Sequence, residues 1–178
     1  MELSPSTSEI WRERDRLDFA ESELKKVGAT HVGYFEALTG QATIHLSIWH
    51  FKDQAVPVIY EAFSEQTSQS VMFYHEVACK TGSGSLCVTS NHHALLDSRP
   101  DTHRLTFLES NSVLKQLKSL KPSLKEGEKI QKINDPKAFL METLEDITEW
   151  GWRLEQLQSD KTLQVLASVG VKMNEGLM

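Results

Sequence analysis

The chain has 178 residues, of which 25% are charged and 39% hydrophobic, and its formal net charge is −6. This length suits a single domain over residues 1–178 with a core large enough to need neither metal nor disulfides. The acidic balance argues against a nucleic-acid-binding protein, and the lack of a long apolar run or an apolar signal core argues for a cytoplasmic protein that does not bind membranes.

The first predicted element is a helix over residues 6–27. Ser6 and Glu9 have the spacing of a capping box, which would satisfy two N–H groups at the helix start. Gly28 stands where a helix favours a left-handed residue at its end. One apolar stripe runs along the helix, and the opposite face is expected to be solvated. The stripe comprises Ile10, Leu17, Ala20, Leu24 and Val27, and the charged face Arg12, Glu13, Arg14, Arg16, Glu21 and Glu23.

Five apolar and β-branched runs follow between residues 30 and 91, separated by short polar turns. No gap could hold the dozen-residue crossover of a parallel pair, so the pattern predicts an antiparallel meander. A sixth short strand is expected around Leu105, Phe107 and Leu108. Pro57 weakens the third run, and residues 54–66 could form either a strand or a helix. The five runs are residues 30–38, 42–51, 55–63, 70–79 and 85–91.

Alternation within the runs predicts a sheet with one dry face and one mixed face. Ile44, Leu46 and Ile48 should share one face, and His45 should lie on the other. We expect His45 and His75 on opposite faces. With Glu36, Glu61 and Glu76 they could line a polar pocket, although ordinary face alternation also explains them.

The C-terminal helical region, about residues 111–170, should contain a helix over residues 111–121 and a long helix that starts near Pro136. Asp135 or Asn134 would cap the long helix, and residues 161–169 would form a last one. The long helix has a strong apolar stripe of Leu140, Leu144, Ile147, Trp150, Leu154 and Leu157. We therefore predict an α+β fold. An antiparallel meander sheet of five to six strands, about residues 30–109, would carry an N-terminal helix and C-terminal helices packed on one face.

Histidines are the candidate ligand-binding residues. His92 and His93 stand in a polar loop with Asp97 and His103 nearby, and His45 is in a strand. Histidine and carboxylate can form an acid–base pair or a zinc site. Their spacing matches no metal motif, so we expect no metal and no cofactor. Solvent-exposed loop histidines are the alternative.

Cys79 and Cys87 flank the Gly82-Ser83-Gly84 turn, which should place them opposite each other on adjacent strands. Cross-strand Cβ atoms are about 4.5–5.5 Å apart, which is long for a disulfide. Two reduced structural thiols are therefore one interpretation, and a redox pair is the other.

Trp150 and Trp152 bring large apolar groups to more than one side of the long helix. Burial in the core between two layers is the more common explanation of such a helix, and an interaction surface for a partner is the other. The basic segment Lys115–Lys137 is interpreted as a solvated face; the alternative is a surface that binds an acidic partner or the phosphates of a nucleic acid. We find no catalytic constellation, so the leading hypothesis is a non-enzymatic interaction module that self-associates as a homo-oligomer. The alternative is a small-ligand-binding protein or enzyme with a pocket between sheet and helices.

Overall fold

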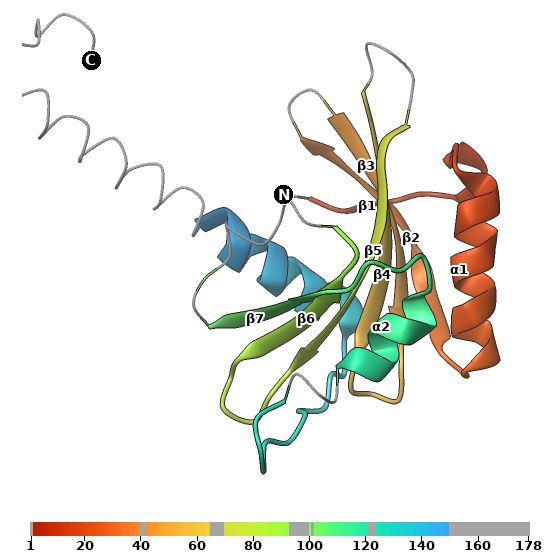
Figure 1. Cartoon of the computed structure of the whole chain (residues 1–178). Helices are drawn as coiled ribbons and strands as arrows, with labels where there is room; N and C mark the ends of the chain where they lie inside the picture. The colour runs from red at the N-terminus through yellow and green to blue at the C-terminus, as the bar shows by residue number, and fades with distance from the viewer. Residues whose placement is uncertain are drawn as a thin grey trace, which may run out of the picture.

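The computed structural model of the chain describes residues 2–39, 42–64, 70–92, 100, 102–120 and 124–149. Within these residues seven strands form one sheet in the order β1-β2-β3-β4-β5-β6-β7 (Figure 1). The strands are β1 (Ser4–Pro5), β2 (Thr30–Thr39), β3 (Ala42–His50), β4 (Val56–Ser64), β5 (Ser70–Lys80), β6 (Leu86–Ser90) and β7 (His103–Phe107). The helical elements are η1 (Ser8–Ile10), α1 (Arg14–Lys26), α2 (Val113–Ser119) and a helix over residues 136–149.

The α+β class and the antiparallel meander are confirmed. All five predicted runs are strands, each paired antiparallel with the next, and residues 56–64 are strand β4 rather than a helix. The pair β6–β7 is parallel, and the connection over residues 91–102 has the dozen residues that a parallel pair requires. None of the helices in the described part of the chain is long and apolar enough to cross a membrane.

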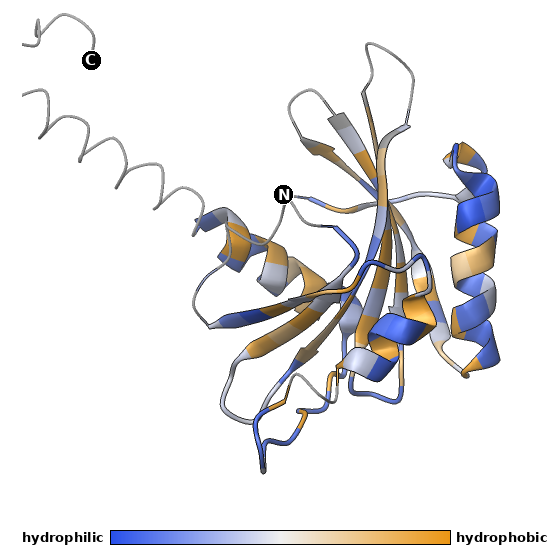
Figure 2. Cartoon of the chain, in the orientation of Figure 1, coloured by the Kyte–Doolittle hydropathy of each residue, from blue (hydrophilic) through white to orange (hydrophobic). Residues whose placement is uncertain are grey.

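Helices cover both faces of the sheet. Residues of α1 and α2, such as Leu17 and Val113, pack on one face, whereas Phe139 and Leu140 pack on the other. The prediction that the C-terminal helices pack on one face is therefore wrong: α2 lies on the face with α1, and the helix over residues 136–149 lies on the other. Figure 1 shows α1 and α2 on one side of the strands and the helix over residues 136–149 on the opposite side. Apolar residues are frequent in the strands, while α1 consists mostly of hydrophilic residues (Figure 2).

The face beneath the helix over residues 136–149 is the drier one. Its core comes from alternate residues of β3 and β4, such as Ile48 and Val58, with Phe139 and Leu140 above them. Asp135 caps this helix as predicted, since its Oδ1 accepts the Ala138 N–H at 3.0 Å. The predicted stripe is confirmed for Leu140, Leu144 and Ile147, which contact the core or line a cavity of about 90 Å³ beneath the helix. Trp150, Leu154 and Leu157 lie outside the described residues.

Truncating Leu140 tests this packing. Leu140→Ala is expected to lower the free energy of unfolding by about 2–5 kcal/mol, as truncations of buried leucines do. The matched control is Leu38→Ala, because the Leu38 side chain on β2 is 74% exposed. Denaturant melts should show almost no loss for the control. A loss below about 0.5 kcal/mol for Leu140→Ala would contradict the packing of this helix on the sheet.

Helix α1 starts eight residues later than predicted, and the backbone just before it is held by another element. The expected capping box does not form: residues 8–10 make a 3₁₀ turn, and Ser6 Oγ is buried without a hydrogen-bond partner in the described part of the chain. Instead, the Glu61 carboxylate on β4 accepts the Arg12 N–H at 3.0 Å and the Glu13 N–H at 2.9 Å. A carboxylate at the positive end of a helix is also electrostatically favourable.

The end of α1 follows the prediction. Gly28 has φ +78°, the left-handed conformation that glycine adopts at low cost. The Ala29 N–H donates to Leu24 O and the Gly28 N–H donates to Lys25 O, both at 3.0 Å, which is the hydrogen-bond pattern of a Schellman motif. Local sequence therefore determines where α1 ends, whereas a distant strand determines where it starts.

Replacing Glu61 is expected to destabilise the protein. Glu61→Ala removes the acceptor for two partly buried N–H groups, and unsatisfied donors of this kind cost about 1–3 kcal/mol in the free energy of unfolding. Glu61→Gln retains one acceptor oxygen and should lose less. Glu13→Gln, which changes a partly exposed side chain at the same helix start, is the control. Equal stability of Glu61→Ala and the wild type in urea melts would show that α1 does not depend on this carboxylate.

Candidate functional site

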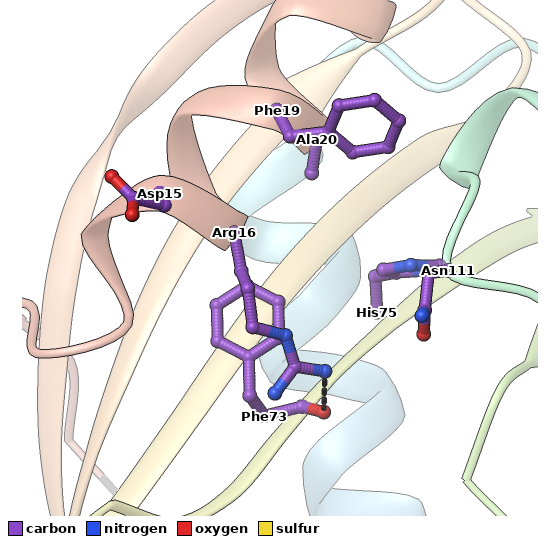
Figure 3. A pocket seen from close by; sticks show the side chains of 7 residues that line it. All are labelled: Asp15, Arg16, Phe19, Ala20, Phe73, His75 and Asn111. Carbon is purple, nitrogen blue, oxygen red and sulfur yellow. Dashed lines mark hydrogen bonds between the residues drawn. The ribbon is translucent and has the colours of Figure 1, made fainter.

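A cavity of about 320 Å³ lies between α1, β5 and the residue before the cap of α2. Its lining combines apolar and aromatic side chains with one cation, one anion, one imidazole and one amide. In Figure 3 these side chains surround a common space, with the Asp15 carboxylate turned away from His75 and Asn111. The lining residues are Asp15, Arg16, Phe19, Ala20, Phe73, His75 and Asn111.

Simple periodicities bring these residues together. On α1, residues 15 and 19 and residues 16 and 20 are four apart, so each pair lies on neighbouring turns. On β5, Phe73 and His75 are two apart and share one face of the sheet. Asn111 directly precedes Ser112, whose side chain accepts the Lys115 N–H as the cap of α2. Ser112 Oγ also donates to Glu23 Oε1 at 2.7 Å, which ties the start of α2 to α1.

Arg16 carries the positive charge of the pocket. Its guanidinium lies 4.3 Å from the centroid of the Phe73 ring, in a cation–π contact. Nη2 donates to Phe73 O at 3.4 Å, and Nη1 is 3.8 Å from Glu13 Oε2. The Arg16 side chain is 45% exposed, so the contact with Glu13 is weak. The ring fixes the guanidinium plane while N–H donors remain available for a stronger acceptor.

His75 is held at the base of the pocket by two amides. Gln116 Nε2 donates to His75 O at 3.1 Å, which orients the amide so that Gln116 Oε1 faces His75 Nδ1 at 2.6 Å. The His75 N–H donates to Asn91 Oδ1 at 2.9 Å, and Asn91 Nδ2 is 3.4 Å from His75 Nε2. In this orientation of the amide, Gln116 Oε1 can accept a proton carried on Nδ1 of the imidazole. His75 is 2% exposed, and burial lowers its pKa, although the hydrogen bond to Gln116 opposes this shift.

The lowered pKa of His75 makes stability depend on pH. Below the ordinary histidine pKa of 6.5, His75 is protonated in the unfolded chain but stays neutral in the folded protein until a lower pH. Because the unfolded chain then binds more protons, the free energy of unfolding falls as the pH drops. The pKa values of His31 and His45 are also lowered, mainly by burial, and act with the same sign. Each histidine contributes at most about 1.4 kcal/mol per pH unit.

We therefore expect lower stability at about pH 5.5 than at about pH 7.5, and a weaker pH dependence in His75→Asn. The measurement is a set of urea melts across this range for both proteins. The slope with pH is compared rather than the absolute stability, because the variant also loses buried hydrogen bonds. An unchanged slope in the variant would show that His75 titrates normally in the folded protein.

The histidines that the sequence singled out lie at separate places. His92 follows the end of β6, its ring centroid 5.1 Å from that of Tyr74, whereas His103 pairs with Leu86 at the start of β6. His103 Nε2 is 3.9 Å from Oδ2 of Asp146, a residue of the helix over residues 136–149. His45 Nδ1 is 3.5 Å from Glu61 Oε2 under α1. None of these three lines the large pocket, and His93 lies outside the described residues.

The prediction that His45 and His75 face opposite sides of the sheet is wrong. His45 pairs with Glu61, and Glu61 pairs with Phe73, so these residues share a face, and His75 lies two residues beyond Phe73. Register between strands, which a single run does not reveal, decides this. Glu76 is on the opposite face, where it lines the small cavity of about 90 Å³.

Cys79 and Cys87 pair directly across β5 and β6, which confirms that they lie on adjacent strands. Both are fully buried. Burial raises the pKa of Cys79 to about 12 and also raises the pKa of Cys87, so both thiols are poor nucleophiles. Their redox role stays a prediction. In the described part of the chain no group of three or more His, Cys, Asp or Glu side chains could hold a metal ion.

Sequence reasoning missed Arg16, Phe73 and Asn111 as site residues, and it grouped His75 with other histidines. Arg16 belongs to a charged face that is usually solvated. Only the period-two relation of Phe73 and His75 pointed to a shared surface, and nothing local shows that α1 crosses it. Comparison of the chain with protein-family models, with curated proteins and with solved structures found no match. The pocket is therefore the feature of this protein that points to a function.

Proposed function

We propose that this protein binds a small molecule in the pocket between α1, β5 and Asn111. The observation that carries the proposal is a cavity of about 320 Å³ with apolar walls and a few polar groups. Ligand sites have this composition, and their volumes start at about 300 Å³. Phe19 is 53% exposed, which is unusual for a large aromatic residue, and it lines this pocket.

Binding without catalysis is the better account of the polar groups. Both ring nitrogens of His75 face amides, and its imidazole is buried and neutral at physiological pH. A general base needs a basic nitrogen within reach of the substrate. In this pocket the imidazole instead supports the floor, while Arg16 and Asn111 are placed to orient a ligand.

Two further expectations remain proposals. A cytoplasmic location was expected from the composition of the N-terminal segment. A homo-oligomer was expected from Trp150 and Trp152, both of which lie outside the described residues. Neither is needed for the pocket, because all seven lining residues come from one copy of the chain.

A fragment screen by NMR tests the proposal. Small ring compounds are expected to shift the amide signals of residues 15–20, 73–75 and 111 in the full chain. Phe19→Ala should weaken their binding by about 2- to 10-fold, as expected for the loss of one aromatic contact. The control is Leu38→Ala, which removes another exposed apolar side chain away from the pocket. Fragments that shift only other regions, or none at all, would contradict the proposal.

A further inference from the structure

The charges around the pocket are distributed unevenly. Its titratable lining groups are Asp15, Arg16 and His75. His75 is neutral, and the Asp15 carboxylate is turned away from the shared space in Figure 3. The guanidinium of Arg16 lies over Phe73 and is the positive charge among the lining side chains.

Arg16 is prepared for an anion. Stacking on Phe73 holds the guanidinium plane, which lowers the entropy lost when its N–H groups form hydrogen bonds. Its present acceptors are weak: Phe73 O is 3.4 Å from Nη2, and Glu13 Oε2 is 3.8 Å from Nη1. A ligand carboxylate can accept two parallel N–H bonds from one guanidinium, and such bonds are roughly twice as strong as neutral ones.

The remainder of the pocket suits a flat apolar body. Phe19 and Ala20 of α1 form one wall, and the Asn111 amide stands across the space from Arg16 (Figure 3). The cavity of about 320 Å³ is near the lower end of the range for ligand pockets, which favours a compact ring over an extended chain.

We propose that the ligand is a compact aromatic acid, with its carboxylate on Arg16 and its ring against Phe19 and Ala20. The inference rests on the proposed function and names the chemical class that the pocket takes. A polar substituent on the ring would contact the Asn111 amide. Asp15 and Glu13 oppose the anion, but a carboxylate in contact with Arg16 outweighs more distant and solvent-screened charges.

The experiment compares three probes that share one ring: benzoate, benzamide and benzylamine. NMR titration of the full chain measures the dissociation constant of each from the shifts of residues 15–20, 73–75 and 111. Benzoate should bind about 3- to 10-fold more tightly than benzamide, since hydrogen bonds to charged groups are strong but water partly screens a half-exposed guanidinium. Added salt should reduce this preference.

Two substitutions with opposite expected effects sharpen the test. Arg16→Gln should abolish the preference for benzoate over benzamide, and Asp15→Asn should increase it. The matched control is Arg12→Gln, because Arg12 lies over Phe63 at the same 4.3 Å without lining the pocket. Arg12→Gln makes the same change of net charge and should leave the preference intact. Thermal melts identify any variant that fails to fold. If Arg16→Gln fails to fold, the expected increase in benzoate preference in Asp15→Asn decides the test.

The outcomes separate the two proposals. Benzamide or benzylamine binding in the pocket as tightly as benzoate would overturn the aromatic-acid assignment and leave the binding pocket standing. A preference for benzoate that survives Arg16→Gln would overturn the assignment of the carboxylate to Arg16. If none of the three probes shifts the pocket residues and the fragment screen also finds no ligand there, both proposals fail.

Discussion

The Glu61 carboxylate on β4 holds the start of α1 against the sheet, and the site depends on it. Glu61 is fully buried and accepts the Arg12 and Glu13 N–H groups, with the His45 imidazole 3.5 Å away. A buried carboxylate is costly unless polar partners surround it. A shift of α1 along the sheet would therefore leave the buried Glu61 carboxylate without its two N–H donors. Because Asp15, Arg16 and Phe19 follow within two turns of this anchor, their positions over β5 depend on it.

A second polar cluster continues this restraint along α1. Glu21 Oε1 accepts from Tyr34 Oη at 2.8 Å and from Ser47 Oγ at 3.0 Å, and Trp49 Nε1 donates to Ser47 Oγ at 2.9 Å. Burial and the neighbouring Glu21 raise the pKa of Tyr34 to about 12, so its hydroxyl remains a donor at physiological pH. Directional bonds of this kind favour one helix position, whereas apolar contacts tolerate several.

The two faces of the sheet therefore have different roles. The face beneath the helix over residues 136–149 is filled by aliphatic and aromatic side chains, and the cavity there is only about 90 Å³. The face under α1 and α2 mixes apolar residues with buried His45, Glu61, His75 and Gln116. The larger cavity lies on this mixed face, where α1 and Asn111 both border β5. The dry face is filled by an apolar core, and the mixed face combines the polar contacts that place α1 with the larger of these two cavities.

The local pattern of the sequence determined the strands, the turn at Gly82-Ser83-Gly84, the end of α1 at Gly28 and the Asp135 cap of the helix over residues 136–149. Each of these depends on residues close together in the chain. Alternation also predicted which residues of one strand share a face. Only the tertiary structure decided the start of α1, since Glu61 is about 50 residues away, and the shared face of His45 and His75, since strand register sets it. The pocket required both decisions, because it joins a helix face, a strand face and the residue before a helix cap that are distant in sequence.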